Sequence, residues 1–131
     1  MADAQALHLA EEAARAADSI KATDIVALDV SRRLPLTDVF VLATGASERQ
    51  VDAIVDAVEE RLIGLGAKPK RREGRSGARW VLLDFGDIVV HVMHAEDREF
   101  YALEKLWKDC PGVDLEGVLE AQAPLVAAAP A

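Results

Sequence analysis

Disulfides, membrane-spanning segments and a secretion signal are all missing from this sequence of 131 residues. Cys110 is the only cysteine, so an internal disulfide is excluded and a buried structural thiol is favoured. No apolar run approaches the ~20 residues that a membrane-spanning helix needs. The acidic, alanine-rich residues 1–17 lack the basic start and the apolar block of a signal peptide. We therefore expect a cytoplasmic protein that makes no contact with a membrane.

Basic residues are outnumbered, because 15 of them stand against 23 acids and give a net charge of −8 at pH 7. Such a surface repels nucleic-acid phosphates and favours basic protein partners, so general nucleic-acid binding is not expected. Residues 68–79 (KPKRREGRSGAR) are the exception, with six bases and one acid. We expect a solvated loop there. A local contact of Arg71 and Arg72 with phosphate is the alternative.

Hydrophobic spacing predicts a helix over residues 3–21, whose alanine stripe buries little area and is expected at the periphery. Strands are predicted at 24–30 and 39–43. The second is continuously apolar, which indicates a strand buried on both faces beneath covering helices. Ser47 and Gln50 then form a capping box that starts the best-marked helix of the chain.

Two apolar runs, 79–85 and 88–93, flank Gly86-Asp87 and predict a hairpin with a two-residue turn. In that register one face is wholly apolar and is expected to be core. Its pairs are Phe85 with Ile88, Leu83 with Val90 and Val81 with Val92. The opposite face is amphipathic, and pairs Asp84 with Val89, Leu82 with His91 and Trp80 with Met93. Such a face either lies under a helix or meets a partner.

A last helix is predicted over residues 96–110, with acids in its first turn as the helix dipole favours. Its expected apolar stripe consists of Phe100, Leu103, Leu106, Trp107 and Cys110, with Tyr101 off that stripe. We place one domain over residues 1–112. Residues 113–131 form an Ala/Pro-rich extension, in which 122–131 are expected to be disordered.

The turn at Gly45–Ser47 resembles the glycine-serine turn of nucleotidyltransferases, where a helix start can hold a phosphate. Those enzymes also need two carboxylates side by side to hold metal ions, whereas Asp84 and Asp87 are split by a turn. His91 and His94 lie three residues apart on a strand and point to opposite faces, so they do not share a metal ion without a bend. We therefore expect no enzyme activity, no metal and no cofactor.

Four segments of the chain stand out together: DIVALDV at 24–30, TDVFVLATGASERQ at 37–50, WVLLDFGDIVVHV at 80–92 and REFYALEKLW at 98–107. They resemble the ribosomal silencing factors, also called RsfS or Iojap-like proteins. The resemblance spans roughly residues 5–110. Its most specific part is the Trp-to-His hairpin followed by the Tyr-x-Leu-Glu-x-Leu-Trp helix.

The resemblance implies an α/β (α+β) fold: a mixed β-sheet of about five strands flanked by helices, nucleotidyltransferase-like in topology but without the catalytic carboxylates. It implies a translational repressor that binds the large ribosomal subunit through its ribosomal protein fourteen and sterically blocks joining with the small subunit. An acidic chain complements such a basic partner. The expected partner contacts are Trp80, Leu82, Asp84, His91, Met93, Tyr101 and Glu104, and the phosphate contacted by Arg71 and Arg72 would be rRNA.

Two other functions remain open at this point. One is a nucleotide-binding or nucleotidyltransferase-like enzyme that uses the Gly45–Ser47 turn. The other is a homodimeric scaffold that uses the same sheet face, because the resemblance implies that family members pair with themselves. A homodimer would then compete with the ribosome for that face.

Overall fold

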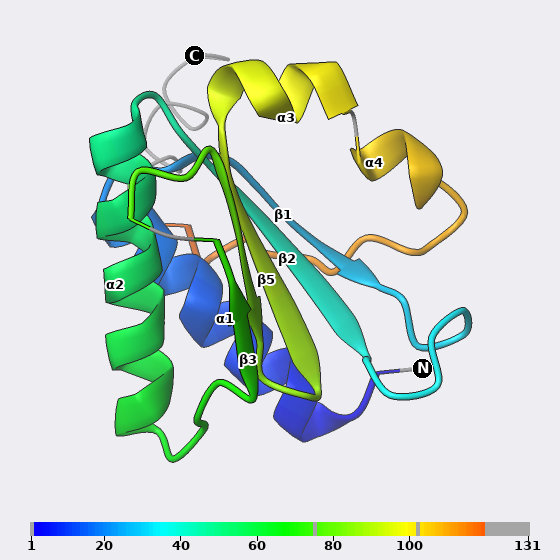
Figure 1. Ribbon diagram of the computed structural model, residues 1–131. Coiled ribbons are helices and arrows are strands. Elements are labelled where there is room, and N and C mark those ends of the chain that lie inside the picture. Colours follow the sequence, from blue (N-terminus) through cyan, green and yellow to red (C-terminus); the bar gives the residue numbers. More distant parts are fainter. Residues whose placement is uncertain (1, 75, 102, 120–131) are drawn as a thin grey trace, which may run out of the picture.

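A computed structural model describes residues 2–74, 76–101 and 103–119, and the side chains of residues 100–104 lie outside that description. One sheet holds five strands in the order β1-β2-β5-β4-β3 (Figure 1). The strands are β1 (Thr23–Asp29), β2 (Val39–Gly45), β3 (Arg71–Glu73), β4 (Trp80–Asp84) and β5 (Ile88–His94). Strands β2 and β5 run parallel and the other neighbours antiparallel, so the sheet is mixed. The predicted fold class is confirmed.

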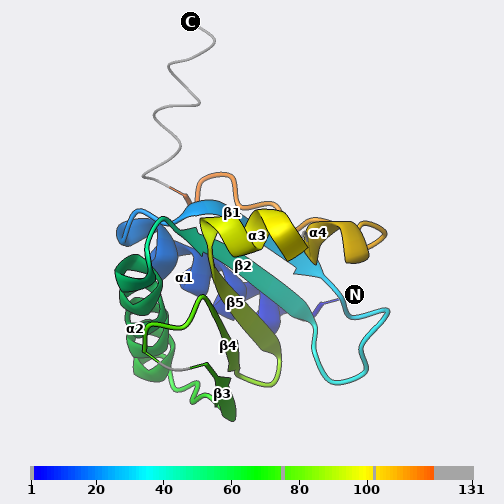
Figure 2. The same cartoon turned by 45° about the horizontal axis from the view of Figure 1, so that its top comes forward.

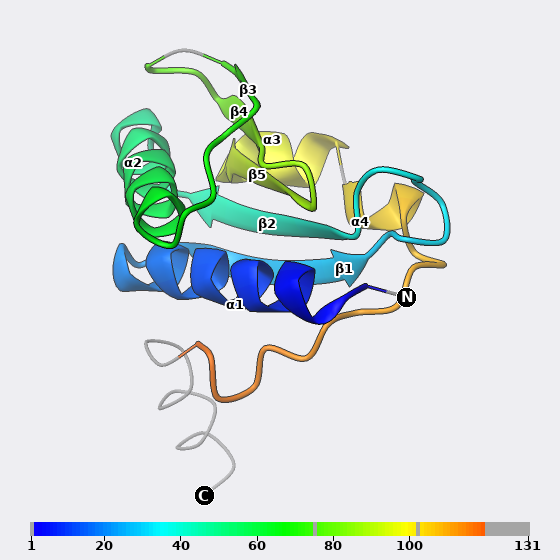
Figure 3. The same cartoon turned by 90° about the horizontal axis from the view of Figure 1, so that it is seen from below.

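Helices lie on both faces of the sheet. The two long ones, α1 (Ala4–Ser19) and α2 (Glu48–Gly64), cover one face (Figure 3). The two short ones, α3 (Ala95–Tyr101) and α4 (Leu103–Leu106), lie on the other (Figure 2). We call this other side of the sheet the second face. Within the described part of the chain, none of the helices combines the length and the apolar character needed to cross a membrane.

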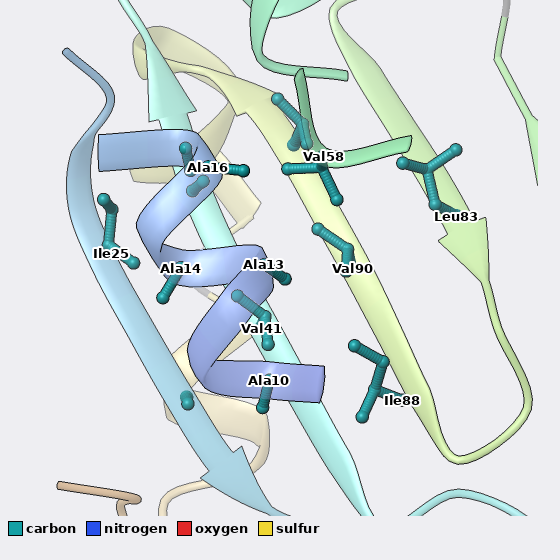
Figure 4. Close-up of a cluster of buried hydrophobic side chains, with 14 of the residues drawn as sticks. Ala10, Ala13, Ala14, Ala16, Ile25, Val41, Val58, Leu83, Ile88 and Val90 are labelled. Carbon is teal, nitrogen blue, oxygen red and sulfur yellow. The ribbon is translucent and has the colours of Figure 1, made fainter. Parts of the chain in front are cut away.

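Helix α1 belongs to the core, so the expectation that it lies at the periphery is wrong. Ala10, Ala13 and Ala14 are completely buried. Figure 4 shows Ala10 and Ala13 on the side of Val41, and Ala14 on the side of β1. Each alanine buries little area, but the absence of bulk lets the whole helix approach the strands closely. The larger side chains of the sheet then fill the space between, as close packing requires.

The hairpin has the predicted register, with Trp80 opposite Met93, Leu82 opposite His91 and Asp84 opposite Val89. The Phe85 N–H donates to the Ile88 carbonyl at 2.9 Å, which closes the two-residue turn. Gly86 has φ of +90°, a conformation that glycine adopts without steric cost. The predicted apolar face points to α1 and α2, and all six of its residues are buried there.

Part of the basic segment is a strand, which corrects the prediction of a loop. Residues 71–73 form β3 and pair with β4 at the edge of the sheet. All three are exposed. A short, charged edge strand protects a sheet from pairing with other chains. It carries no apolar pattern, and for that reason the sequence does not reveal it.

The last predicted helix is instead two short ones, α3 and α4. Leu106 is 65% exposed, so its assignment to the apolar stripe is wrong, whereas Cys110 is buried as predicted. The Arg33 guanidinium donates to the Leu106 carbonyl at 3.0 Å, which satisfies an acceptor at the end of α4. The predicted positions of Phe100 and Leu103 fall on side chains outside the described set.

The core continues past the domain boundary predicted at residue 112. The Asp29 N–H donates to the Pro111 carbonyl and the Val113 N–H to the Ala27 carbonyl, so this segment covers the outer edge of β1. Leu115 and Val118 are then buried in the same core cluster as α1. Figure 3 shows the chain after α4 returning past β1 to the side of the sheet that α1 covers. The expected disorder of residues 122–131 falls outside the described residues.

Candidate functional site

The second face has its own apolar cluster, separate from the core beneath α1 and α2. Its buried members are Leu28, Val30, Phe40, Leu42, Val89, Met93 and Cys110. Trp80, Leu82 and Trp107 pack against them and are only partly buried. This face is therefore a second, thinner core with aromatic side chains at its boundary.

Trp107 closes the half of the second face that lies over β2. Its ring meets Phe40 edge-on, with centroids 4.9 Å apart, an arrangement that aromatic pairs prefer. The Arg33 guanidinium lies 4.5 Å from the centre of the Trp107 ring and also donates to Asp109 at 3.0 Å. A cation over an aromatic face is attracted to it. The half over β4 has no such cover from Trp107.

His91 lies between these two halves. The Trp80 indole N–H donates to its Nδ1 at 3.3 Å, and Phe40 packs edge-on against the ring at 4.9 Å. Burial above all, and the nearby charge of Arg98, lower the pKa of His91 to about 4. The ring is therefore neutral at pH 7, with Nδ1 as an acceptor and the proton on Nε2. Nε2 is buried and finds no hydrogen-bond partner among the described residues.

The predicted site residues divide into a surface group and a floor. Trp80, Leu82 and Asp84 are half-buried and reach the surface. His91 is 6% exposed and Met93 fully buried, which corrects the expectation that both are available to a partner. They lie on β5, between β2 and β4, and are paired with Leu82 and Trp80, which they support from below. The side chains of the two further predicted residues, Tyr101 and Glu104, are outside the described set.

A hollow of about 260 Å³ opens beside Trp80, and Glu73, Gly74, Trp80 and Leu82 line it. Glu73 lies directly opposite Leu82 across the β3–β4 pair. Gly74 has φ of +106°, and a Cβ there would lie 2.9 Å from the Trp80 carbonyl oxygen, so only glycine fits. Glu73 was missed at the sequence level because β3 was. The one acid in a basic segment was the available signal.

Arg71 and Arg72 point to opposite faces of the sheet, as neighbours on a strand do. Arg71 pairs with Asp84 in register and so belongs to the second face, where its Nε lies 3.4 Å from Glu73. Arg72 belongs to the other face and donates to Glu59 of α2 at 2.9 Å. The sequence treated them as one contact, but only Arg71 shares a face with Trp80.

Arg79 connects the second face to two helices, and the sequence analysis did not identify it. Its guanidinium donates to Asp97 of α3 at 3.0 Å and lies 3.8 Å from Glu48 at the start of α2. The hydrogen bond to Asp97 raises the pKa of Arg79. These contacts join both helices to the strand that begins with Trp80. Acids in the first turns of two helices were the sequence signal.

Backbone N–H groups at the Gly45–Ser47 turn already have acceptors within the same segment of the chain. The Ala46 N–H donates to Gln50 Oε1 at 2.6 Å, and the Gln50 N–H to Ser47 Oγ at 3.1 Å. A Cβ on Gly45 would lie 3.0 Å from Val51, so the glycine serves close packing of α2. The turn is thus a helix cap. Within the described part of the chain, no three His, Cys, Asp or Glu side chains are grouped to hold a metal ion.

A protein-family comparison matches residues 3–130 to "Ribosomal silencing factor during starvation". The chain belongs to the RsfS family. It is 45% identical over 111 residues to the ribosomal silencing factor RsfS of Halalkalibacterium halodurans, covering 85% of this chain and 95% of that protein. It is 39% identical over 114 residues to the chloroplastic protein Iojap of Zea mays, covering 86% of this chain and 49% of Iojap.

Two crystal structures share the fold. One is a protein from Bacillus halodurans, with a TM-score of 0.72 and 42% identity over 86% of this chain and all of that one. The other comes from Chromobacterium violaceum, with a TM-score of 0.73 and 40% identity over 77% of this chain and 84% of that one. Family membership makes this RsfS-type chain a regulator of translation without catalytic activity. The enzyme alternative is thereby set aside.

Proposed function

We propose that this chain represses translation by binding the large ribosomal subunit, through its ribosomal protein fourteen, so that the small subunit cannot join. Membership of the RsfS family supports a role at the ribosome. The observation that supports a docking role for the second face is that part of its apolar surface is not buried. Trp80 and Leu82 remain partly exposed above a floor of buried apolar side chains.

Such a face fits what protein interfaces need. Tryptophan is among the residues that most often dominate binding energy, and the hydrogen bond to His91 fixes the Trp80 indole in one orientation. A patch of the usual size, roughly 800 Å² per partner, fits one side of a domain of this length. The net charge of −8 favours a basic ribosomal protein over bare rRNA.

Repression would then be steric, and it needs no chemistry. A domain seated on the subunit interface occupies volume that the small subunit would otherwise fill. We place the chain in the cytoplasm, together with the large subunit that it is proposed to bind. A homodimer through the same face would cover Trp80 and compete with this binding.

The test is sedimentation of the full chain with purified large subunits, small subunits and joined ribosomes. We expect co-migration with large subunits, and fewer joined ribosomes when the chain is added before the subunits are mixed. Co-migration with small subunits alone would overturn the proposal. A stable dimer that binds neither subunit would favour the scaffold.

A further inference from the structure

The hollow beside β3 and β4 combines an apolar base with the carboxylate of Glu73, the one charged residue among its described lining residues. Trp80 and Leu82 supply the apolar and aromatic surface, and Glu73 supplies the carboxylate. The backbone at Gly74 fixes one wall, because its contact with the Trp80 carbonyl leaves no room for a side chain. At about 260 Å³ the hollow falls below the ~300–1,000 Å³ usual for small-molecule pockets.

We propose that this hollow receives one lysine or arginine side chain of the protein partner, and that Glu73 selects its positive charge. The inference rests on the proposed function, since it assumes that the second face meets a protein. Long basic side chains bury an aliphatic stem on apolar surface and keep the charged end in reach of an acceptor. Leu82 offers the apolar surface, and the Trp80 ring adds attraction for the cation.

In the free chain, Arg71 already pairs with Glu73, in the place that the partner's basic side chain would take. Its Nε lies 3.4 Å from a carboxylate oxygen of Glu73, and the two side chains are 62% and 59% exposed. Exposed pairs of this kind contribute only ~0–1 kcal/mol, so an incoming cation that is also desolvated on Trp80 can displace Arg71. Arg71 therefore acts as an internal competitor that holds Glu73 until the partner arrives.

A phosphate group is the less suitable occupant of the hollow. Glu73 places a negative charge at the rim, and Asp84 lies on the same face directly opposite Arg71. The two carboxylates would repel a phosphate that approached Arg71. A role for Arg71 in holding rRNA is the opposing hypothesis, and it predicts the opposite result when Arg71 is changed.

The experiment measures the affinity of the full chain for isolated large subunits at several salt concentrations, in Glu73→Gln and Arg71→Gln variants. Each has a matched control on α2 with the same change of charge, Glu60→Gln and Arg49→Gln, both at exposed positions. Wild-type binding is measured in the same series, so failure of this inference is distinguished from failure of the proposed function. Thermal melts verify that the variants are folded.

We expect Glu73→Gln to weaken binding about fivefold relative to Glu60→Gln, because a charged pair at an interface is lost. Arg71→Gln should leave affinity equal to that of Arg49→Gln or raise it up to about threefold, because the competitor is gone. Equal affinities of Glu73→Gln and Glu60→Gln would overturn the inference. So would weaker binding by Arg71→Gln with a salt slope reduced by about one, since that is the signature of a lost phosphate contact.

Discussion

The indole N–H of Trp80 donates to Nδ1 of His91, 3.3 Å away, across two neighbouring antiparallel strands. His91 is buried and Trp80 only partly so. A buried residue thus fixes the orientation of a partly exposed one, and the proposed docking face is held in shape before any partner arrives. Preorganisation of this kind lowers the entropy cost of binding.

Replacing Trp80 by alanine should weaken binding to the large subunit by ~2 kcal/mol or more, because an aromatic anchor of the docking face is removed. The fold should lose less, since part of this side chain is already exposed to water. Binding curves and thermal melts on the same preparation check both expectations.

The matched control for that variant is Leu83→Ala, further along the same strand β4 and on the opposite face of the sheet. Leu83 is fully buried beneath the long helices. Its truncation should cost ~2–5 kcal/mol of unfolding free energy and affect binding only through unfolding. If Trp80→Ala melts as early as Leu83→Ala, then Trp80 belongs to the core and the chosen docking face is wrong.

Acid should destabilise the fold through His91. The pKa of His91 is lowered to about 4 in the folded chain, from an ordinary value of 6.5. Between these values the unfolded chain binds the proton and the folded chain does not, so stability falls as the pH drops from 6.5 to 4. The loss is ~3 kcal/mol in all. Denaturant titrations at stepped pH measure this loss.

His91→Asn isolates that contribution, because the amide keeps an acceptor for Trp80 but has no titrating group. The slope of stability between pH 6.5 and pH 4 should flatten in this variant. Asp29 acts at lower pH: burial alone would raise its pKa, but hydrogen bonds from Ser31 and the Ala2 N–H lower it on balance. Its contribution is lost only below its ordinary pKa of 3.8. If the slope of stability between pH 6.5 and pH 4 is the same in His91→Asn as in the wild type, His91 does not titrate in this range.

The hairpin was predictable because its register follows from a local signal. A Gly-Asp pair between two apolar runs fixes a two-residue turn, and every pairing then follows by counting. The face that points to the long helices, with Leu83 and Val90, was identified in the same way. The burial of His91 was not, because it depends on long-range neighbours, namely Phe40 of β2 and Arg98 of α3.

The missed features share a physical cause, namely that long-range contacts override local pattern. β3 has three charged residues and is a strand only because β4 offers it a partner. Arg33 lies over the ring of Trp107, far along the chain, so the environment of Leu106 does not follow from helical periodicity. Leu115 and Val118 stand in a segment without helical or strand periodicity. They are buried because backbone hydrogen bonds hold that segment along the edge of β1, next to the core.

The helix cap at Ser47 gives a prediction that also tests the enzyme alternative. Ser47→Ala should cost roughly 0.5–2 kcal/mol of stability, because the Gln50 N–H loses its acceptor. With magnesium and a nucleoside triphosphate, neither wild type nor variant should show specific turnover. A turnover that Ser47→Ala abolishes would contradict the assignment of this turn as a cap alone.

The segment after Gly112 gives the last prediction, which locates the end of the folded domain. A chain ending at residue 119 should melt close to the full chain, whereas one ending at 112 should lose about 3 kcal/mol. Leu115 and Val118 are both over nine-tenths buried, and burial of such side chains is worth roughly 1.5–3 kcal/mol each as an upper estimate. The shorter chain also loses the hydrogen bond from the Val113 N–H to Ala27, which covers the edge of β1. Leu115→Ala in the full chain is the control that separates lost packing from lost edge cover, because it removes only the side chain. Equal melting of the chains ending at 112 and 119 would place the boundary at 112, as the sequence alone predicts.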